Sequence, residues 1–352
     1  TSKRIWECNK FYWNSYSKRL MAIDKKYVDQ IIKVSEKAAL ASSYLVGKKD
    51  KIAADQAAVD AMRSELNKID MNGEVVIGEG SLDEAPMLYT GEKLGNKNGP
   101  YFDIAVDPLE GTNFAANNLP GATSVISIAE KGNLFNAPET YMDKIATGPI
   151  EKGLVDLDFT LKKNTSNLAD FLHKDISSLT ACVMDRPRHQ KIIDELKQLN
   201  IKIKLIKDGD VLGALYVTDP RYNVDIFLGI GGGPEGVLAA SALDAFNCHF
   251  QGRFIFDNDK DIKDAKRMGI IDLNKKYELN EIIKGDSIFC STGITSSEML
   301  NGVVINNNEY TTETFVTHKS LKFKETIKRT NLIEEWFLFQ VRSGNKKKLI
   351  KT

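Results

Sequence analysis

The 352-residue chain has few cysteines and histidines, no long apolar run and no net charge. Its four cysteines form no Cys-x-x-Cys pair and its four histidines are not spaced as zinc ligands, so zinc and other soft or imidazole-bound metals are disfavoured. No apolar run reaches the roughly 20 residues that a membrane-spanning helix needs. The 48 basic and 48 acidic residues are interspersed, which does not favour nucleic-acid binding.

Signals for secretion and for nucleotide binding are also missing. The N-terminus lacks the charged-then-apolar order of a secretion signal, and Cys182, Cys248 and Cys290 lie in or beside apolar segments that suggest buried, reduced thiols. We therefore expect a soluble cytoplasmic protein. The glycine-rich stretch 231–236 invites a dinucleotide-binding interpretation, but it contains neither Gly-x-Gly-x-x-Gly nor Gly-Lys-Ser/Thr, which disfavours that alternative.

The most informative segment is Asp107-Pro108-Leu109-Glu110-Gly111-Thr112, which follows an apolar run that predicts a short buried strand. Pro108 fixes its own φ and disfavours helix in the residue before it, so we expect the strand to end at Asp107. Ligands gather at strand ends in α/β folds. Two hard carboxylates and a hydroxyl here suit a metal that activates water for phosphate chemistry. Alone, the motif is equally an ordinary strand-turn-helix junction.

More acidic residues occur at comparable positions. Glu79 stands between two glycines directly after a compact apolar strand, where a carboxylate gains little from packing. Asp55 lies in the alanine-rich helical segment 50–59, where a solvated helical face is the ordinary interpretation. Glu235 lies in the glycine-rich stretch 231–236, whose backbone amides could bind phosphate ahead of a helix that we expect near Val237.

These motifs stand in the order found in class II fructose-1,6-bisphosphatases, and the chain resembles this family. The family is a branch of the lithium-sensitive, metal-dependent sugar-phosphate and inositol-phosphate phosphatases. The resemblance covers residues 23–315. The matching segments are 49–55, 76–89, 107–112, 136–142, 186–189, 208–210, 231–236 and 292–295.

The resemblance implies a site for two or more divalent ions. Asp55 and Glu79 would hold one metal, and Asp107, Glu110 and Glu235 would hold another. All five are hard oxygen donors, which suit Mn²⁺ or Mg²⁺.

The resemblance also implies catalytic roles. Thr112 would orient or activate the nucleophile, and Lys51 would offset developing negative charge. The metal-binding carboxylates Asp55 and Glu79 belong to the same catalytic group. The implied reaction is direct in-line attack on a phosphate ester, without a stable phosphoenzyme.

Substrate contacts follow from the same resemblance. Arg186 and Arg188, which flank a proline in what we expect to be an extended segment, suit a phosphate bound by forked hydrogen bonds. The resembled family often has lysine at the first position, so Arg186 departs from its pattern. The two aspartates of the Asp-Gly-Asp turn can accept hydrogen bonds from sugar hydroxyls or shape their own backbone. The implied contacts are Glu110, Gly111, Thr112, Tyr141, Arg186, Pro187, Arg188, Asp208, Gly209, Asp210 and Gly232.

The pattern of elements predicts an α/β fold. Apolar residues at three- and four-residue steps predict a helix from Lys25 onward. We expect strands at 75–77, 103–106, 121–129 and 154–161 to form a mixed sheet, with a hairpin-like turn at 131–133. Strands at 179–184, 201–206 and 225–230 alternate with helices at 190–199 and 210–217, which is a βα pattern. The resemblance implies a layered α/β/α/β/α sandwich with two mixed sheets and the active site between the halves.

We expect residues 1–20 to be an extension outside the core, 21–178 a metal-binding α+β domain, and 179–352 a second α/β domain that contributes substrate-binding residues. The resemblance implies hydrolysis of the 1-phosphate of fructose 1,6-bisphosphate, a gluconeogenic reaction, with sedoheptulose 1,7-bisphosphate as alternative substrate. It also implies a homo-oligomer, with a tetramer favoured. A non-catalytic metal or phosphate sensor is the alternative from another class, although every expected ligand position is acidic.

Overall fold

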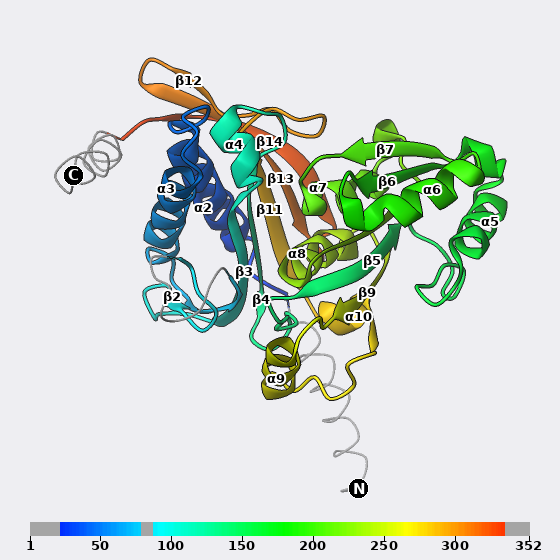
Figure 1. The fold of residues 1–352 in the computed structure, drawn as a ribbon. Helices are drawn as coiled ribbons and strands as arrows, with labels where there is room; N and C mark the ends of the chain where they lie inside the picture. Colours follow the sequence, from blue (N-terminus) through cyan, green and yellow to red (C-terminus); the bar gives the residue numbers. More distant parts are fainter. Residues whose placement is uncertain (1–21, 79–86, 335–352) are drawn as a thin grey trace, which may run out of the picture.

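The computed structural model describes residues 22–78 and 87–334, which form two mixed β-sheets and the helices around them (Figure 1). The first sheet has the strand order β12-β13-β11-β4-β3-β1-β2, and β14 also pairs with β13. Its one parallel pair is β1 with β3. The strands are β1 (Asn72–Ile77), β2 (Lys93–Leu94), β3 (Tyr101–Glu110), β4 (Thr123–Glu130), β11 (Ser287–Gly293), β12 (Val304–Asn306), β13 (Glu309–His318) and β14 (Phe323–Leu332).

The second sheet has the strand order β10-β9-β5-β8-β6-β7. Strand β6 is parallel to β7 and β8, whereas β5 is antiparallel to both of its neighbours. The strands are β5 (Tyr141–Thr147), β6 (Thr180–Met184), β7 (Lys202–Ile206), β8 (Ile226–Gly232), β9 (His249–Ile255) and β10 (Lys276–Glu278).

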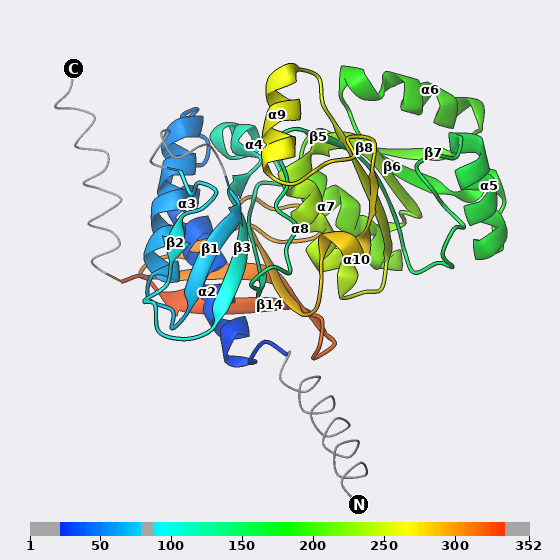
Figure 2. The same cartoon turned by 90° about the horizontal axis from the view of Figure 1, so that it is seen from below.

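Helices form three layers that alternate with the sheets (Figures 1 and 2). Helices α2 (Lys26–Ser43) and α3 (Lys51–Leu66) cover the outer face of the first sheet. Helices α7 (Asp210–Leu215) and α8 (Gly233–Asp244) lie between the two sheets. Helices α5 (Leu161–Leu172) and α6 (Gln190–Gln198) cover the outer face of the second. The expected α/β/α/β/α sandwich is therefore confirmed.

The apolar stripes of the sequence explain these layers. Along α2 the predicted stripe, which includes Ile31, Ile32, Ala38 and Ala39, is fully buried against the first sheet. The predicted βα alternation in the second half is confirmed by β6, α6, β7, α7 and β8 in chain order. None of the helices within 22–78 and 87–334 combines the length and apolarity that crossing a membrane requires.

Strand β3 does not end at Asp107, so that prediction was wrong. The strand continues through Pro108 to Glu110, and its pairing with β4 shifts register between Asp107 and Glu110. Such a bulge leaves a residue outside the regular ladder, which is where a sheet tolerates a proline without an N–H group. The bulge carries Glu110 into the interior, where it is buried.

The strand expected at 154–161 is also absent, because this segment is a series of turns. Side chains form hydrogen bonds to its backbone N–H and C=O groups, which a neighbouring strand would otherwise do. Asn164 bonds both the amide and the carbonyl of Asp156, each at 2.9 Å, and Gln251 accepts from the amide of Leu157 at 2.9 Å. Thr160 then caps α5 by accepting from the amide of Lys163. Local side-chain hydrogen bonds thus replace a ladder.

The division of the chain between the two sheets does not fall at residue 178, where the sequence predicts a domain boundary. Strand β5 belongs to the second sheet, although it precedes that residue. Strands β11 to β14 return to the first sheet at the end of the described chain. The second sheet is therefore built from one continuous stretch, and the first from two separate ones. The division into domains 21–178 and 179–352 stays a prediction, and the expected extension 1–20 lies outside the described residues.

A buried carboxylate joins three distant segments at one end of the first sheet. Asp286, just before β11, accepts hydrogen bonds from the Ile23 amide at 2.8 Å, the Ser320 hydroxyl at 2.7 Å and His318 Nε2 at 2.8 Å. Burial alone would raise the pKa of Asp286, but these hydrogen bonds outweigh it and lower the pKa below its ordinary value.

We expect Asp286→Asn to lower the free energy of unfolding by about 2–3 kcal/mol at neutral pH, because hydrogen bonds to a charged acceptor are lost. The native pKa is depressed, so the wild-type carboxylate stabilises the fold above roughly pH 4 and loses this contribution as the pH falls through the native pKa. Urea unfolding of the wild-type and Asp286→Asn proteins across this pH range measures the difference between their free energies of unfolding. The half-exposed Asp264→Asn is the matched control, and a constant difference between wild type and Asp286→Asn at all pH values would contradict the assignment.

Candidate active site

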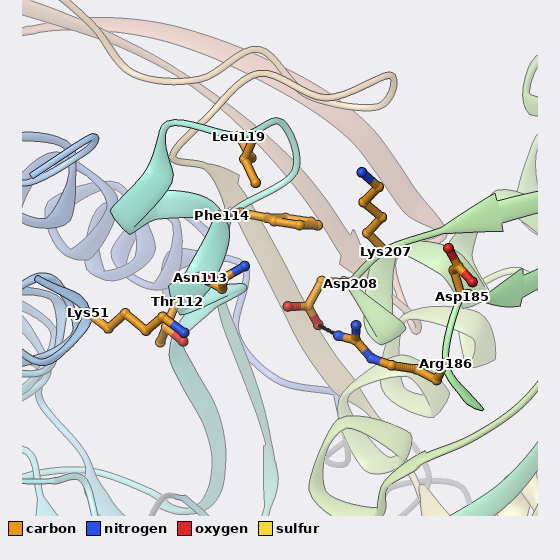
Figure 3. Close-up of a pocket in the computed structure, with 9 residues that line it drawn as sticks. All are labelled: Lys51, Thr112, Asn113, Phe114, Leu119, Asp185, Arg186, Lys207 and Asp208. Atoms are coloured by element: carbon orange, nitrogen blue, oxygen red, sulfur yellow. Dashed lines mark ion pairs between the residues drawn. The ribbon is translucent and has the colours of Figure 1, made fainter. Parts of the chain in front are cut away.

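A cavity of about 720 Å³ opens between elements of the two sheets (Figure 3). Helices α3 and α4 (Thr112–Asn117) form one side of it, and the segments that follow β6 and β7 form the other. Four of the lining residues were predicted from the sequence: Lys51, Thr112, Arg186 and Asp208. The lining also includes Asn113, Phe114, Leu119, Asp185 and Lys207.

Lys51 and Thr112 share a wall because the loop before α3 is attached to α4. The amide of Lys49 donates to the carbonyl of Ala116 at 2.8 Å, and Asp50 caps the start of α3 with its side chain. Lys51 is thereby the first residue of α3. Its side chain enters the cavity on the same side as that of Thr112 (Figure 3).

Gly111 sets the direction of Thr112. Gly111 lies between β3 and α4. Its φ of 80° is in the left-handed region, which glycine adopts without strain. Thr112 is the first helical residue, so it is not the helix cap. Its hydroxyl makes no hydrogen bond to the residues that the structure describes, and it faces the cavity. This leaves the hydroxyl available to a ligand.

The expectation that Arg186 and Arg188 lie in one extended segment was wrong. Residues Pro187–His189 form a short 3₁₀ turn, closed by a 2.9 Å hydrogen bond from the His189 amide to the Arg186 carbonyl. Proline favours the first position of a helical turn because its φ is already suitable. The turn sends the two guanidinium groups in different directions.

Only Arg186 lines the cavity, where it forms a 3.4 Å ion pair with Asp208 (Figure 3). Arg188 instead donates from Nε to the Ile230 carbonyl at 2.7 Å, and its guanidinium lies 4.9 Å from the centre of the Tyr141 ring. Arg188 and Tyr141 thus form a second, cationic and aromatic group at the end of β8.

His189 anchors this turn to strands β6 and β8. It is fully buried, its Nδ1 lies 2.8 Å from the Met184 carbonyl and its Nε2 accepts from the Ile230 amide at 2.8 Å. A ring nitrogen bonded to a carbonyl donates, so Nδ1 donates to Met184, while Nε2 lies beside both the Ile230 amide and, at 3.0 Å, the Ile230 carbonyl. His189 is the last residue of the matching segment 186–189, and the structure shows that it joins the end of β6 to β8.

Glu110, Asp210 and Glu235 form a cluster of carboxylates, in which Glu110 and Asp210 are buried and Glu235 is half-buried. Burial, together with the neighbouring Asp210 and Glu235, raises the pKa of Glu110 to about 8, while a 2.9 Å hydrogen bond from the Val211 amide opposes this shift. Burial likewise raises the pKa of Glu235. Gly209, with φ 84°, turns the chain so that Asp208 reaches the cavity and Asp210 the cluster.

Family comparisons agree with this arrangement. Residues 25–331 match the sequence model of a family described as bacterial fructose-1,6-bisphosphatase, glpX-encoded. The chain belongs to this family. The expected resemblance to class II fructose-1,6-bisphosphatases is thereby confirmed.

Relatives named D-fructose 1,6-bisphosphatase class 2/sedoheptulose 1,7-bisphosphatase support the assignment to the family. One from Prochlorococcus marinus (strain MIT 9301) is 42% identical over 295 residues, which are 80% of this chain and 89% of the relative. Another from Synechococcus sp. (strain JA-2-3B'a(2-13)) is 40% identical over 333 residues, 87% of this chain and 96% of the relative. Among solved structures, a Thermotoga maritima IMPase matches at TM-score 0.32 and 16% identity, covering 58% of this chain and 76% of its own.

Membership of the fructose-1,6-bisphosphatase family implies dependence on a divalent metal, and the donor chemistry of the site fits one. Burial raises the pKa of Asp55 to about 6. Its Oδ1 atom and Oε2 of Glu235 are buried without a hydrogen bond to any described residue. Buried carboxylate oxygens without donors are costly, and a hard cation is the partner that they suit.

The structure does not bring the five predicted metal ligands into one closed group. Within residues 22–78 and 87–334 no three acidic, histidine or cysteine side chains are placed to hold an ion together. Glu79 lies outside the described residues. The assignment of Asp55, Glu79, Asp107, Glu110 and Glu235 as metal ligands stays a prediction.

Sequence reasoning overlooked one charged residue at this site. Lys144 of β5 pairs with Asp210 and donates to the Gly232 carbonyl at 2.8 Å. Its neighbours in the sequence gave no signal, because a lysine within a strand is ordinarily solvated. By contrast, Asp185 and Lys207 directly precede Arg186 and Asp208, so adjacency to predicted residues could have identified them as cavity-lining.

Proposed function

We propose that this protein is a metal-dependent phosphatase that hydrolyses the 1-phosphate of fructose 1,6-bisphosphate to give fructose 6-phosphate and phosphate. The observation that carries the proposal is the cavity in which Lys51 and Thr112 face Arg186 and Asp208 (Figure 3). The buried carboxylates Glu110 and Asp210 follow closely along the chain, since each stands two residues from a cavity residue, Thr112 or Asp208. Cations suited to phosphate and acids suited to a metal thus meet at one place in a chain of the fructose-1,6-bisphosphatase family.

Some residues of the cavity are suited to bind the phosphate of the substrate, and others to bind its sugar. Arg186 lies where its forked guanidinium can bind a phosphate group of the substrate. Lys51 lies where its ammonium can offset the negative charge that develops on the transferred phosphoryl group. Asp208 can accept hydrogen bonds from sugar hydroxyls, and Arg188 with Tyr141 offers a second binding surface.

Thr112 contributes the hydroxyl that orients the attacking water. Divalent ions, Mn²⁺ or Mg²⁺ held by Asp55, Glu79, Asp107, Glu110 and Glu235, would supply Lewis acidity and acidify that water. The chain's own task is positioning, since phosphoryl transfer depends mainly on alignment and electrostatic stabilisation.

Sedoheptulose 1,7-bisphosphate is the second candidate substrate. The relatives from Prochlorococcus marinus and Synechococcus carry both activities in their names. Both sugars present a phosphate at C1 and hydroxyls beside it, so the same cavity residues would serve either.

A phosphate-release assay with Mg²⁺ or Mn²⁺ tests the proposal. We expect turnover of fructose 1,6-bisphosphate, turnover of sedoheptulose 1,7-bisphosphate at a comparable rate, and little release from inositol monophosphate or nucleotide monophosphates. Removal of divalent ions with EDTA should abolish the activity, and adding back Mn²⁺ or Mg²⁺ should restore it. A protein that binds Mn²⁺ and phosphate but releases none from either bisphosphate would instead be a non-catalytic sensor.

The proposed enzyme acts in the cytoplasm as a homo-oligomer, for which a tetramer is the favoured state. Light scattering on the eluted peak of a sizing column measures the subunit number directly. A monomer that retains full turnover would contradict the oligomer and leave the proposed reaction intact.

A further inference from the structure

Strand β14 ends the first sheet and leaves one edge open. Every residue of β13 that pairs with β11 or β12 also pairs with β14, so β14 lies on the opposite side of β13 from both. Among the residues that the structure describes, no strand pairs with the other edge of β14. The strand runs from Phe323 to Leu332 without a bulge or a proline. A long, regular row of backbone donors and acceptors is therefore open to another chain.

Hydrogen bonds to β13 identify the residues of β14 whose backbone groups face outward. The amide of Ile333, just after β14, donates to the Asn308 carbonyl at 2.7 Å, so odd-numbered residues direct their backbone groups toward β13. Successive residues along a strand alternate in this direction. The outward-facing backbone groups belong to Lys324, Thr326, Lys328, Thr330 and Leu332.

A second copy of this strand can pair with the open edge in only a few antiparallel registers. Residues that exchange hydrogen bonds lie opposite each other, so even-numbered residues must face even-numbered ones. A two-fold axis then gives one register for each central residue. Among the registers centred on residues 325–329, all but one place like charges opposite each other, which destabilises a sheet. In those registers Glu325, Lys328 or Arg329 would face its own copy, or Lys324 would face Lys328.

The register centred on Ile327 avoids this repulsion. Glu325 of each copy then lies opposite Arg329 of the other, and Ile327 lies opposite itself. Opposite charges and apolar side chains across a strand pair stabilise it, and the symmetry repeats the charged pair. Arg329 already pairs with Asp29 through Nη2, but its guanidinium retains further N–H donors. The remaining pairs set each lysine opposite a threonine: Lys324 with Thr330, and Lys328 with Thr326.

Lysines on an edge strand can protect it from pairing, and β14 carries two of them. Both lysines interact within their own chain. The ammonium of Lys324 lies 4.5 Å from the centre of the Phe246 ring. Lys328 lies opposite Glu313 of β13, and its charge lowers the pKa of that carboxyl. Their charges are thus partly balanced before a second copy arrives.

We propose that β14 is a two-fold contact between copies of this chain. It pairs antiparallel with β14 of a second copy about Ile327, which joins the two first sheets into one continuous sheet. This contact goes beyond the proposed phosphatase function and does not depend on it, because none of the residues that line the cavity belongs to β14.

Thr326→Pro tests the open edge. Proline removes an N–H group that faces outward and leaves the hydrogen bonds to β13 in place, as edge strands allow. We expect the variant to sediment as an assembly with half the subunit number of the wild-type protein. Thr326→Val keeps the N–H group and is the matched control, which should assemble as the wild type does. Equal sedimentation of wild-type protein and folded Thr326→Pro would overturn the contact.

A charge exchange between positions 325 and 329 tests the register. We make it in an Asp29→Asn background, which removes the ion pair of Arg329 within its own chain. Glu325→Arg alone and Arg329→Glu alone each place like charges opposite, so the dissociation constant between copies should rise about ten- to a hundredfold. The two together restore opposite charges and should restore assembly.

Light scattering over a dilution series measures these dissociation constants. The charge exchange does not depend on the proline variant, so it tests the contact even if Thr326→Pro fails to fold. Rescue is expected only where residues 325 and 329 face each other. Weakened assembly that the double exchange does not restore would overturn the register, and unchanged assembly in both single variants would overturn the contact.

The contact and the phosphatase function fail in different ways. A wild-type protein that is monomeric by light scattering overturns the contact, whatever its turnover. An assembled protein that releases no phosphate from either sugar bisphosphate rejects the phosphatase function and leaves the contact at β14 intact.

Discussion

Asp107→Asn should fold normally and lose at least about a hundredfold of its turnover, the effect of removing a main electrostatic contributor from an active site. Asp107 lies at the bulge of β3, between the regular strand and Glu110. The substitution removes one negative charge from the proposed metal site while changing almost no volume. Phosphate release at saturating Mn²⁺ or Mg²⁺ measures the effect, and circular dichroism and the melting temperature report on the fold.

Asp103→Asn is the control on the same strand. Asp103 is also buried, but its carboxylate accepts from the amides of Gly132 at 2.6 Å and Leu134 at 3.3 Å, away from the cavity. We expect this variant to melt earlier and to keep its turnover. Near wild-type turnover of Asp107→Asn at saturating metal would remove Asp107 from the proposed site.

Thr112→Ala should reduce kcat severely with a small change in KM, whereas Thr112→Ser should keep a measurable fraction of the activity. The serine retains the hydroxyl oxygen that orients the attacking water, and the alanine removes it. An interaction made chiefly in the transition state affects kcat and leaves substrate affinity almost unchanged. Initial rates over a range of fructose 1,6-bisphosphate concentrations separate the two parameters.

Thr160→Ala supplies the structural comparison for Thr112→Ala. Thr160 is a true helix cap, which accepts a hydrogen bond from the Lys163 amide at the start of α5. Its loss should cost about 1 kcal/mol of stability without affecting turnover. Thr112 follows the cap Gly111, so its replacement should have a smaller effect on melting. Equal, high activity in Thr112→Ala and Thr112→Ser would reduce Thr112 to a structural residue.

Most of the fold was predictable because apolar periodicity is a local property of the sequence. The stripe of α2 and the alternating strands and helices from β6 to β8 follow from spacing alone. Proline was misleading at β3 since its effect depends on the partner strand: beside a regular ladder Pro108 would end pairing, but a bulge accommodates it. The segment 154–161 was misassigned because distant Gln251 satisfies part of its backbone.

The site was predictable where chemistry is concentrated in short motifs. Lys51, Thr112, Arg186 and Asp208 line one cavity although they come from four different segments. Lys144 could not be found in this way, because its meaning depends on partners 66 and 88 positions away along the chain. The direction of Arg188 was equally inaccessible, since it depends on the 3₁₀ turn at Pro187–His189.

The order in which the strands are made has a consequence for synthesis of the protein. Strand β4 pairs with β11 along seven residues, yet Ser287 of β11 is translated long after Glu130 of β4. At about 5–20 residues per second, the ribosome needs on the order of ten seconds or more to cover that interval. During this time the first sheet presents an unpaired apolar edge, which is the kind of surface on which nascent chains associate wrongly. All strands of the second sheet are translated before β11, so this sheet can form while the edge of β4 is still unpaired. We therefore expect the interval between translation of β4 and translation of β11 to be the stage at which this enzyme depends on chaperones.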